Sequence, residues 1–378
     1  MESSTTLNSK VTVPPLQVVF EKEARERILA ALDDCLASGL VASGKNVQAF
    51  ENWWANDCRT KHGIACSSGG AALEIIMKAL DVRGKDVLVP TNTFIATVNA
   101  VIFAGGNPIF LDVDPKTMGV NLEEMKRKTT NNTVAAVVVH IGGIMTPEMP
   151  MIADWCQEQH ILLIEDAAHA PGSEVGGKRA GQYGIAAAYS FFATKVVTCG
   201  EGGMVVTNDD RLADRCRCIQ DYGKKSQWES EHTILSSNYR MSEIDAIIGL
   251  AHAQRLEEFI AYRKTIADRY TEALRGVLEL VLPAERSSWY KYIAFLPEEM
   301  DRARFRGTLK EIGITLPGGV YDLPIHLQPV FESYQLRGTL PVSEDVCSRH
   351  ICLPIFSSMT NAQVEYTISS VRSLVQPF

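Results

Sequence analysis

The chain has 378 residues, of which 46% are apolar and 22% are charged, and its formal net charge is −8 at pH 7. This length suits a large domain with a smaller one, and an acidic balance without clustered Lys and Arg speaks against nucleic acid as a partner. The longest apolar run, residues 134–139, has only the length of a strand, so we expect no membrane-spanning helix and no membrane partner.

The first 20 residues have neither the basic start nor the apolar stretch of a signal peptide, and we expect them to form a flexible arm. The nine cysteines follow no regular spacing, which is typical of reduced thiols in the cytoplasm. Cys216 and Cys218 form the closest pair, but on a helix they would point to different faces, and no set of Cys and His completes a metal site. We therefore predict a cytoplasmic protein without a metal.

The first expected element is a packing helix over residues 21–39. Its apolar residues recur on one face from Ala24 to Leu36, and Gly39 can end it. From residue 60 to 210, short apolar runs such as "DVLVP" and "ILLIEDAA" alternate with helical stretches. Runs that are apolar throughout indicate strands buried on both faces, so we predict an α/β fold with a mainly parallel sheet covered by helices.

A different pattern follows. A long helical segment from Ser242 to about Leu274 leads to the strand-like "WYKYIAFLP" and to three further helical patterns. These lie around residues 301–312, 342–350 and 361–374. We expect a large α/β domain over residues 21–254 and a smaller α+β domain over residues 255–378.

Asp166 is the first candidate catalytic residue. In "LLIEDAAHAPGS", apolar residues run straight into Glu165 and Asp166, at the end of a predicted strand where ligands of parallel sheets bind. A carboxylate buried there needs a positive partner, such as a charged group on a cofactor. A helix N-cap is the competing interpretation, and this segment alone does not decide between the two.

Lys195 is the second candidate. It follows the strand-like "AAAYSFF" and precedes the glycine turn of "CGEGGMVVT". In a cramped, partly apolar loop a lysine loses its proton more easily and can attack a carbonyl, although a lysine before a glycine turn is more often a solvated surface residue. Pyridoxal 5'-phosphate (PLP) is the carbonyl cofactor that requires such a lysine together with an acid paired to its ring nitrogen.

A phosphate group would need hydrogen-bond donors, and "CSSGGAALEI" offers them. Ser68, Gly69 and Gly70 lie between a predicted strand and an apolar helix, so backbone N–H groups at the start of this helix could hold an anion. An ordinary helix cap made of small residues is the alternative.

Seven motifs occur in an order that resembles one protein family. They are "PTNTFIAT", "FLDVD", "IEDAAHAPGS", "SFFATK", "CGEGGMVVTND", "NYRMSEIDAIIG" and "PIHLQP". Together they resemble the DegT/DnrJ/EryC1/StrS family of PLP-dependent sugar aminotransferases, which have the aspartate aminotransferase-like fold (fold type I), and the likeness covers nearly the whole chain. The resemblance implies transfer of an amino group, with L-glutamate as donor, to a keto group of a nucleotide-linked deoxysugar.

The resemblance also implies roles for single residues. Lys195 would bind PLP covalently, and Asp166 would pair with its pyridine nitrogen. Ser190 and the segment Ser68 to Gly70 would hold the phosphate, and Asn238 would reach it from a neighbouring subunit, which implies a homodimer with shared active sites.

Three further residues complete the expected site. Phe94 matches the residue stacked on the cofactor ring, His169 would pack near the ring hydroxyl, and His326 is a candidate for binding the substrate. One departure is Gly70, which stands where the family usually has a threonine that can contact the phosphate.

Other functions fit the sequence less well than a sugar aminotransferase. In the PLP-dependent sugar dehydratases of the same family a histidine replaces the lysine, so Lys195 speaks against that activity. A nicotinamide-dependent dehydrogenase would need a G-x-G-x-x-G motif that opens a helix, and the chain has none. A non-catalytic PLP-binding regulator would need an output module, for which no separate domain is visible. Cyclitols stay open as acceptors beside sugars.

Overall fold

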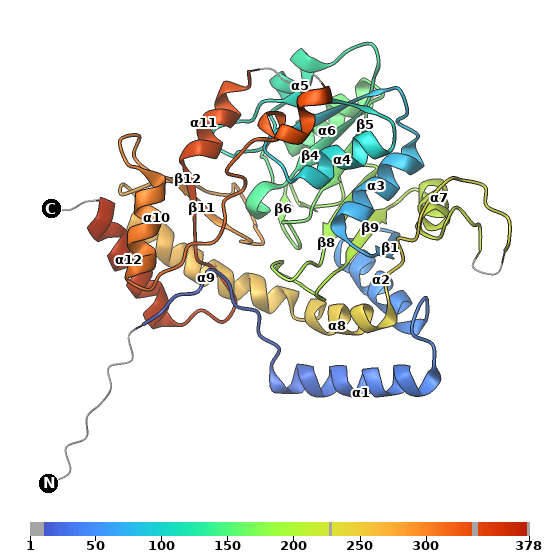
Figure 1. The fold of residues 1–378 in the computed structure, drawn as a ribbon, viewed down its shortest axis with the longest axis horizontal. Helices are drawn as coiled ribbons and strands as arrows, with labels where there is room; N and C mark the ends of the chain where they lie inside the picture. Colours follow the sequence, from blue (N-terminus) through green and yellow to red (C-terminus); the bar gives the residue numbers. More distant parts are fainter. Residues whose placement is uncertain (1–10, 227–228, 335–338, 376–378) are drawn as a thin grey trace, which may run out of the picture.

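The computed structural model describes residues 11–226, 229–334 and 339–375. A seven-stranded sheet with helices on both faces forms the larger part, and a three-stranded sheet with its own helices forms the smaller part (Figure 1). The strands of the large sheet run in the order β1-β9-β8-β5-β4-β2-β3. Their bounds are β1 His62–Cys66, β2 Asp86–Pro90, β3 Asn107–Leu111, β4 Thr133–Val139, β5 Leu162–Asp166, β8 Ala186–Ser190 and β9 Gly203–Thr207.

Only β9 runs antiparallel to its neighbours, β1 and β8, and every other adjacent pair in the large sheet is parallel. The other six strands therefore end at one edge of the sheet. The prediction of a mainly parallel sheet covered by helices is confirmed. Because β1 and β8 both pair with β9, the starts of the segments that follow β1 and β8 lie close together.

Successive residues of the central strands pack into two different cores, which explains why these strands are apolar throughout. Val137 belongs to one core, whereas Ala136 and Val138 belong to the other. The first core is covered by α3 Gly69–Leu80, α4 Ile95–Phe103 and α7 Asp210–Gln220. The second is covered by α2 Lys45–Asp57, α5 Leu122–Lys128, α6 Met149–Glu158 and α8 Glu243–Ala253.

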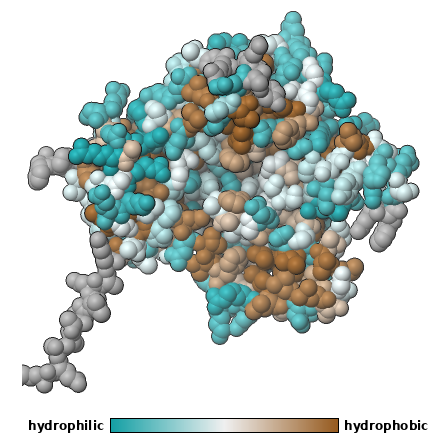
Figure 2. All heavy atoms as spheres, viewed as in Figure 1, coloured by the Kyte–Doolittle hydropathy of each residue, from teal (hydrophilic) through white to brown (hydrophobic). Residues whose placement is uncertain are grey.

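Helix α1 (Lys22–Ser38) lies outside these layers, beside α8 (Figure 1). It ends at Gly39 as predicted, where a φ of 69° favours glycine. Its predicted apolar face is only partly covered: Ala24 is buried, but Leu36 is 63% exposed. Figure 2 shows apolar side chains gathered over this part of the surface.

The smaller part consists of three antiparallel strands and four helices. They are β10 Glu279–Val281, β11 Tyr292–Phe295, β12 His350–Leu353, α9 Leu256–Leu274, α10 Arg302–Glu311, α11 Pro341–Arg349 and α12 Asn361–Val375. The single helical segment predicted from Ser242 onward is two helices, because the chain breaks between α8 and α9 at Gln254 and Arg255. This break falls at the predicted domain boundary.

Val13, in the predicted arm, contacts the smaller part. The N–H of Val13 donates to the carbonyl of Gly313, and the carbonyl of Val13 accepts from Thr315. Val13 is also buried in the core of the smaller part. Residues 1–10 of the arm lie outside the described residues.

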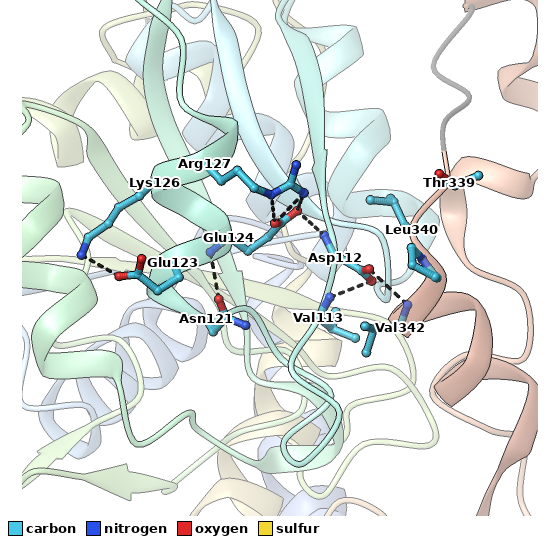
Figure 3. A pocket seen from close by; sticks show the side chains of 11 residues that line it. Asp112, Val113, Asn121, Glu123, Glu124, Lys126, Arg127, Thr339, Leu340 and Val342 are labelled. Atoms are coloured by element: carbon cyan, nitrogen blue, oxygen red, sulfur yellow. Dashed lines mark hydrogen bonds and ion pairs between the residues drawn. The ribbon is translucent and has the colours of Figure 1, made fainter.

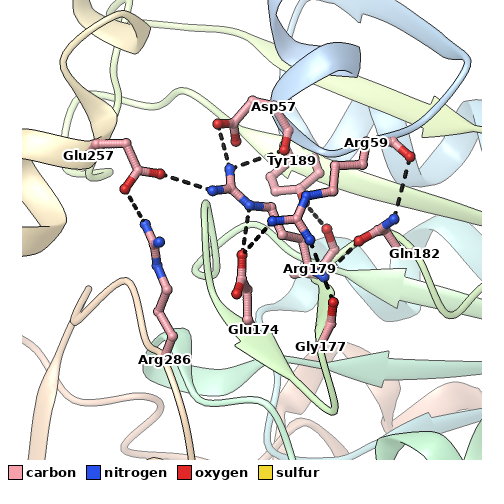
Figure 4. A network of polar contacts seen from close by, with 10 residues as sticks. Asp57, Arg59, Glu174, Gly177, Arg179, Gln182, Tyr189, Glu257 and Arg286 are labelled. Atoms are coloured by element: carbon pink, nitrogen blue, oxygen red, sulfur yellow. Dashed lines mark hydrogen bonds and ion pairs between the residues drawn. The ribbon is translucent and has the colours of Figure 1, made fainter.

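An ion-pair network joins the hairpin of β6 (Glu174–Val175) and β7 (Lys178–Arg179) to two helices, α2 and α9 (Figure 4). The guanidinium of Arg179 lies 2.5 Å from Asp57 at the end of α2, 2.9 Å from Glu174 and 3.0 Å from Glu257 on α9. Arg286 binds the second oxygen of Glu257. The network thus links the hairpin to the first helix of the smaller part.

Two kinds of feature are absent from the described residues. None of the helices in these ranges combines the length and apolar character needed to cross a membrane. No group of three His, Cys, Asp or Glu side chains within them is arranged to hold a metal ion.

Candidate active site

A cavity of about 520 Å³ lies at the carboxyl ends of the parallel strands. It is lined by Ser68, Gly69, Gly70, Leu73, Thr93, Phe94, Ala96, Thr97, Val139, Asp166, Ala168, His169, Ser190, Phe192, Thr194, Lys195, Glu201, Tyr290 and Tyr321. Eight of the ten candidates from the sequence are therefore brought together, and Asn238 and His326 are not.

Asp166 ends β5 and is buried in the cavity wall. Its Oδ2 accepts a hydrogen bond from the hydroxyl of Thr97 at 2.8 Å, and its Oδ1 accepts one from the N–H of Ala168 at 3.2 Å. Burial raises the pKa of Asp166, whereas these two bonds and the nearby amine of Lys195 favour the charged form. The two bonds orient the carboxylate, and in its charged form it can pair with a positive ring nitrogen.

Lys195 lies in the loop after β8, and its Nζ is 4.7 Å from the centroid of the Tyr290 ring. Burial lowers its pKa from 10.5 to about 7; Asp166 opposes this shift, and the charge of Lys291 adds to it. Near pH 7, the Lys195 amine is then neutral in about half of the molecules, and the neutral amine is the form that attacks a carbonyl.

The start of α3 forms a cradle for an anion. The hydroxyl of Ser68 caps the helix by accepting from the N–H of Ala71, while the N–H groups of Gly69 and Gly70 belong to the first turn and have no acceptor within the helix. A Cβ on Gly69 would lie only 2.7 Å from the Cβ of Ser190. Glycine therefore allows the helix start and the end of β8 to approach each other.

His169, Tyr290 and Tyr321 form one wall of the cavity. The ring of His169 stacks on that of Tyr290 at a centroid distance of 4.3 Å. Its Nδ1 accepts from the N–H of Gly142 at 3.2 Å, and its Nε2 lies 3.4 Å from the hydroxyl of Tyr321. Burial lowers the pKa of His169 well below its usual value, so the ring is neutral and its Nε2 carries the proton.

Phe94 precedes α4, and 56% of its surface is exposed, which leaves its ring free to stack on a planar group. No local sequence pattern indicates Tyr290, Tyr321 or Thr97 as residues of this site. Tyr290 was part of a predicted strand, and no pattern separates it from the neighbouring aromatic residues. Tyr321 lies far along the chain, in a loop that predictions from local pattern do not position.

Two predicted site residues lie outside the cavity. Asn238 is exposed, and its Oδ1 accepts from the N–H of Arg240. His326 is completely buried, with its Nδ1 2.7 Å from the hydroxyl of Thr91 and its Nε2 3.1 Å from Glu344. Its ring nitrogens thus bond to protein groups that hold the loop.

A larger cavity of about 760 Å³ lies between α5 and α11, away from Lys195 (Figure 3). Its polar groups already bind one another. Asp112 accepts from the N–H groups of Val342 and Ser343, and Glu124 pairs with Arg127. These contacts hold α11 against the large sheet. They also leave few polar groups in this cavity that could bind a ligand.

The residues around Lys195 fit PLP. The cavity combines three groups that PLP requires. Lys195 can lose its proton and bind the carbonyl carbon, and the buried carboxylate of Asp166 can pair with the ring nitrogen. The N–H groups at the start of α3 can bind the phosphate. The fold and this set of groups define a PLP-dependent aminotransferase.

Comparison with known proteins gives the family. The model of the DegT/DnrJ/EryC1/StrS aminotransferase family matches residues 22–372. The chain therefore belongs to this family. A GDP-perosamine synthase of Escherichia coli O157:H7 is 35% identical over 347 residues, which cover 90% of this chain and 93% of the relative. The predicted family, PLP dependence and transaminase activity are confirmed.

Solved structures agree with this family. DesV of S. venezuelae has a TM-score of 0.91 and 28% identity, with 97% of this chain and 99% of that chain covered. NtdA of Bacillus subtilis, solved with its cofactor PMP bound, has a TM-score of 0.89 and 26% identity, with 98% of this chain and 86% of that chain covered.

Proposed function

We propose that the protein transfers an amino group from L-glutamate to a keto group of a nucleotide-linked deoxysugar. The observation that carries the proposal is the shared cavity of Lys195, Asp166 and the start of α3. The name of the E. coli relative supports a sugar acceptor and makes a GDP-linked keto sugar the first one to assay.

The side chains of the cavity have distinct roles in this proposal. PLP, when bound, supplies an electron sink for the carbon that loses its proton. Lys195 Nζ would hold the cofactor at rest and would then act as the general base for the proton on Cα of the amino donor, for which a pKa of about 7 suits it. Asp166 holds the positive charge of the ring nitrogen, and Thr97 and Ala168 keep its two oxygens in place.

The remaining groups bind the cofactor and orient it. The N–H groups of Gly69 and Gly70, with the hydroxyl of Ser190, hold the phosphate. Phe94 would cover one face of the ring, and His169 would lie near the ring hydroxyl.

A homodimer in the cytoplasm completes the proposal. Exposed apolar residues near α1 form a patch that suits a second copy: Leu29, Leu36, Leu40 and Val41. The exposed amide of Asn238 would enter the partner's cavity and contact the phosphate there. Nine free, buried cysteines fit a reducing compartment.

Visible absorbance of the PLP-loaded protein tests the proposal. The absorbance should fall when L-glutamate is added and return with a keto acid, and Lys195→Ala should abolish both changes while the control Lys264→Ala keeps them. Formation of an aminosugar from the GDP-linked keto sugar would then identify the acceptor. If glutamate leaves the absorbance of the wild type unchanged, the proposed reaction is wrong, and dehydration or sensing becomes the better hypothesis.

A further inference from the structure

Tyr290 brings the smaller part of the chain into contact with the loop that carries Lys195. It lies between β10 and β11 and lines the cavity. Its hydroxyl lies 3.2 Å from the hydroxyl of Thr194, the residue directly before Lys195. The Nζ of Lys195 lies over the Tyr290 ring, 4.7 Å from its centroid. One side chain therefore contacts both the residue before the lysine and the reactive amine.

The main chain around Tyr290 is bonded to the loops that follow β4 and β5. The N–H of Tyr290 donates to the hydroxyl of Ser288 at 3.2 Å, and this hydroxyl donates to the carbonyl of His169 at 2.5 Å. The N–H of Lys291 donates to the carbonyl of Gly142 at 3.0 Å. The ring of Tyr290 also stacks on that of His169. Tyr290 is therefore held on both sides along the chain and can support a more mobile side chain.

Lys195 needs such a support because its amine stands on a flexible four-carbon stem. Attack on a carbonyl requires the nitrogen to lie about 3–3.5 Å from the carbon, in a suitable direction. The N–H of Lys195 donates to the carbonyl of Phe192 at 2.9 Å, which fixes the main chain of the loop but not the amine. The hydroxyl of Thr194 has Tyr290 as its hydrogen-bond partner in the described part of the chain. This bond ties the lysine's own segment to the smaller part.

The amine of Lys195 has few other contacts that could fix its position. Within residues 11–226, 229–334 and 339–375, its Nζ forms no hydrogen bond or ion pair, and the Tyr290 ring is the group over which it lies. Asp166 favours the charged amine and the charge of Lys291 disfavours it, but neither is in contact with it. Burial raises the pKa of the Tyr290 phenol, so the ring is neutral. An aromatic ring attracts an ammonium group placed over it.

We infer that Tyr290 is a positioning residue for Lys195, an inference that rests on the proposed function. Its hydroxyl holds Thr194 and its ring lies beside the amine, so the amine is directed into the cavity before PLP enters. In the step that this prepares, the neutral amine adds to the aldehyde carbon of PLP. The aldehyde oxygen then leaves as water with the two protons of the amine. Tyr290 takes no part in the bonds that form or break.

Capture of PLP by the cofactor-free protein tests this inference. The absorbance of the covalent link, followed over a range of PLP concentrations, separates the first-order step at Lys195 from the saturation constant for PLP. Tyr290→Phe and Thr194→Val remove the same hydrogen bond from its two ends. We expect each to slow the first-order step about 3- to 10-fold, the range for a neutral hydrogen bond, and the double variant to be no slower than the single ones.

Three controls separate positioning from a general change of the cavity. Pyridoxamine 5'-phosphate (PMP) has no aldehyde, so its affinity, measured by calorimetry, should be the same in Tyr290→Phe and the wild type. Thr194→Ser keeps a hydroxyl and should recover most of the rate lost in Thr194→Val. The matched control Tyr366→Phe removes a hydroxyl that binds the carbonyl of Ile312, away from the cavity, and should capture PLP as the wild type does.

Three results would overturn the role of Tyr290. The first is a first-order step in Tyr290→Phe that equals that of the wild type. The second is an equal loss of PMP affinity and of capture rate, which would mean that the whole cavity has changed. The third is a double variant in which the two effects multiply, because the two hydroxyls would then act independently. A wild type that captures no PLP at Lys195 would contradict the proposed function as well.

Discussion

Replacing Thr97 with valine would remove one hydrogen bond from the carboxylate of Asp166 with little change in volume. Thr97 is fully buried, and its hydroxyl lies 2.8 Å from Oδ2 of Asp166 and 2.8 Å from the hydroxyl of Thr93. Since the Thr97 hydroxyl donates to the carboxylate, the Thr93 hydroxyl donates to Thr97. The substitution therefore leaves Asp166 with one fewer donor and Thr93 without its acceptor.

The magnitude follows from the charge of the acceptor. A hydrogen bond to a charged group contributes about 1.5–3 kcal/mol, which changes the ratio of charged to neutral carboxyl by about 10- to 150-fold. The bond favours the charged form, so its loss raises the pKa of Asp166, which burial already raises. A neutral Asp166 cannot hold a positive ring nitrogen. The loss of kcat/KM at acidic pH should therefore begin at a higher pH in Thr97→Val.

The assay is the rate at which L-glutamate removes the visible absorbance of the PLP-loaded protein, measured from acidic to alkaline pH. Thr207→Val is the control, because Thr207 is also buried but its hydroxyl binds the carbonyl of Ile185, away from the cavity. Thr207→Val should lose about 1 kcal/mol of stability through its missing neutral hydrogen bonds, and Thr97→Val should lose more, because one of its missing bonds is to a charged group. If the acid side of the profile is the same in Thr97→Val and Thr207→Val, Thr97 does not maintain the charge of Asp166.

Three further predictions concern single residues. The rate at which PLP binds to the cofactor-free protein should rise with pH and reach half of its maximum near pH 7, because the pKa of Lys195 is about 7 and the neutral amine reacts. Gly69→Ala should weaken PLP binding at least tenfold in a spectroscopic titration, since the added methyl group would collide with Ser190. Arg179→Met should lower the free energy of unfolding by about 2–3 kcal/mol in urea, because it leaves the carboxylate of Asp57 without its cation.

Each of these has a result that would contradict it. A half-maximal rate of PLP binding near pH 10 would mean that the site does not lower the pKa of Lys195. Unchanged PLP affinity in Gly69→Ala would show that the start of α3 is not the phosphate site. A stability of Arg179→Met equal to that of Arg59→Met, which removes a more exposed cation of the same network, would mean that the buried Arg179 contributes no more than a surface ion pair.

The sequence predicted the parts of the site that depend on local pattern. Asp166 and Lys195 follow apolar runs that predict buried strands, and the carboxyl ends of parallel strands share one edge of the sheet. Gly69 and Gly70 were recognisable because a strand, small residues and an apolar helix follow one another directly. The resemblance to one family added Phe94 and His169, which local pattern alone does not distinguish from ordinary core residues.

Other parts depend on contacts between distant segments. Tyr290 and Tyr321 reach the cavity from the smaller part of the chain, and the network of Arg179 joins residues up to 122 positions apart. His326 was expected near the substrate, but its loop turns the ring toward Thr91 and Glu344. Such positions follow from packing between elements, which periodicity does not encode.

The most direct test of the account is to find the lysine that binds PLP. Borohydride reduction of the PLP-loaded protein would fix the covalent link, and mass spectrometry of its peptides would locate it. The account predicts the added mass on the peptide that contains Lys195 and an unmodified peptide around Lys291. Modification of Lys291, or of no lysine at all, would contradict it.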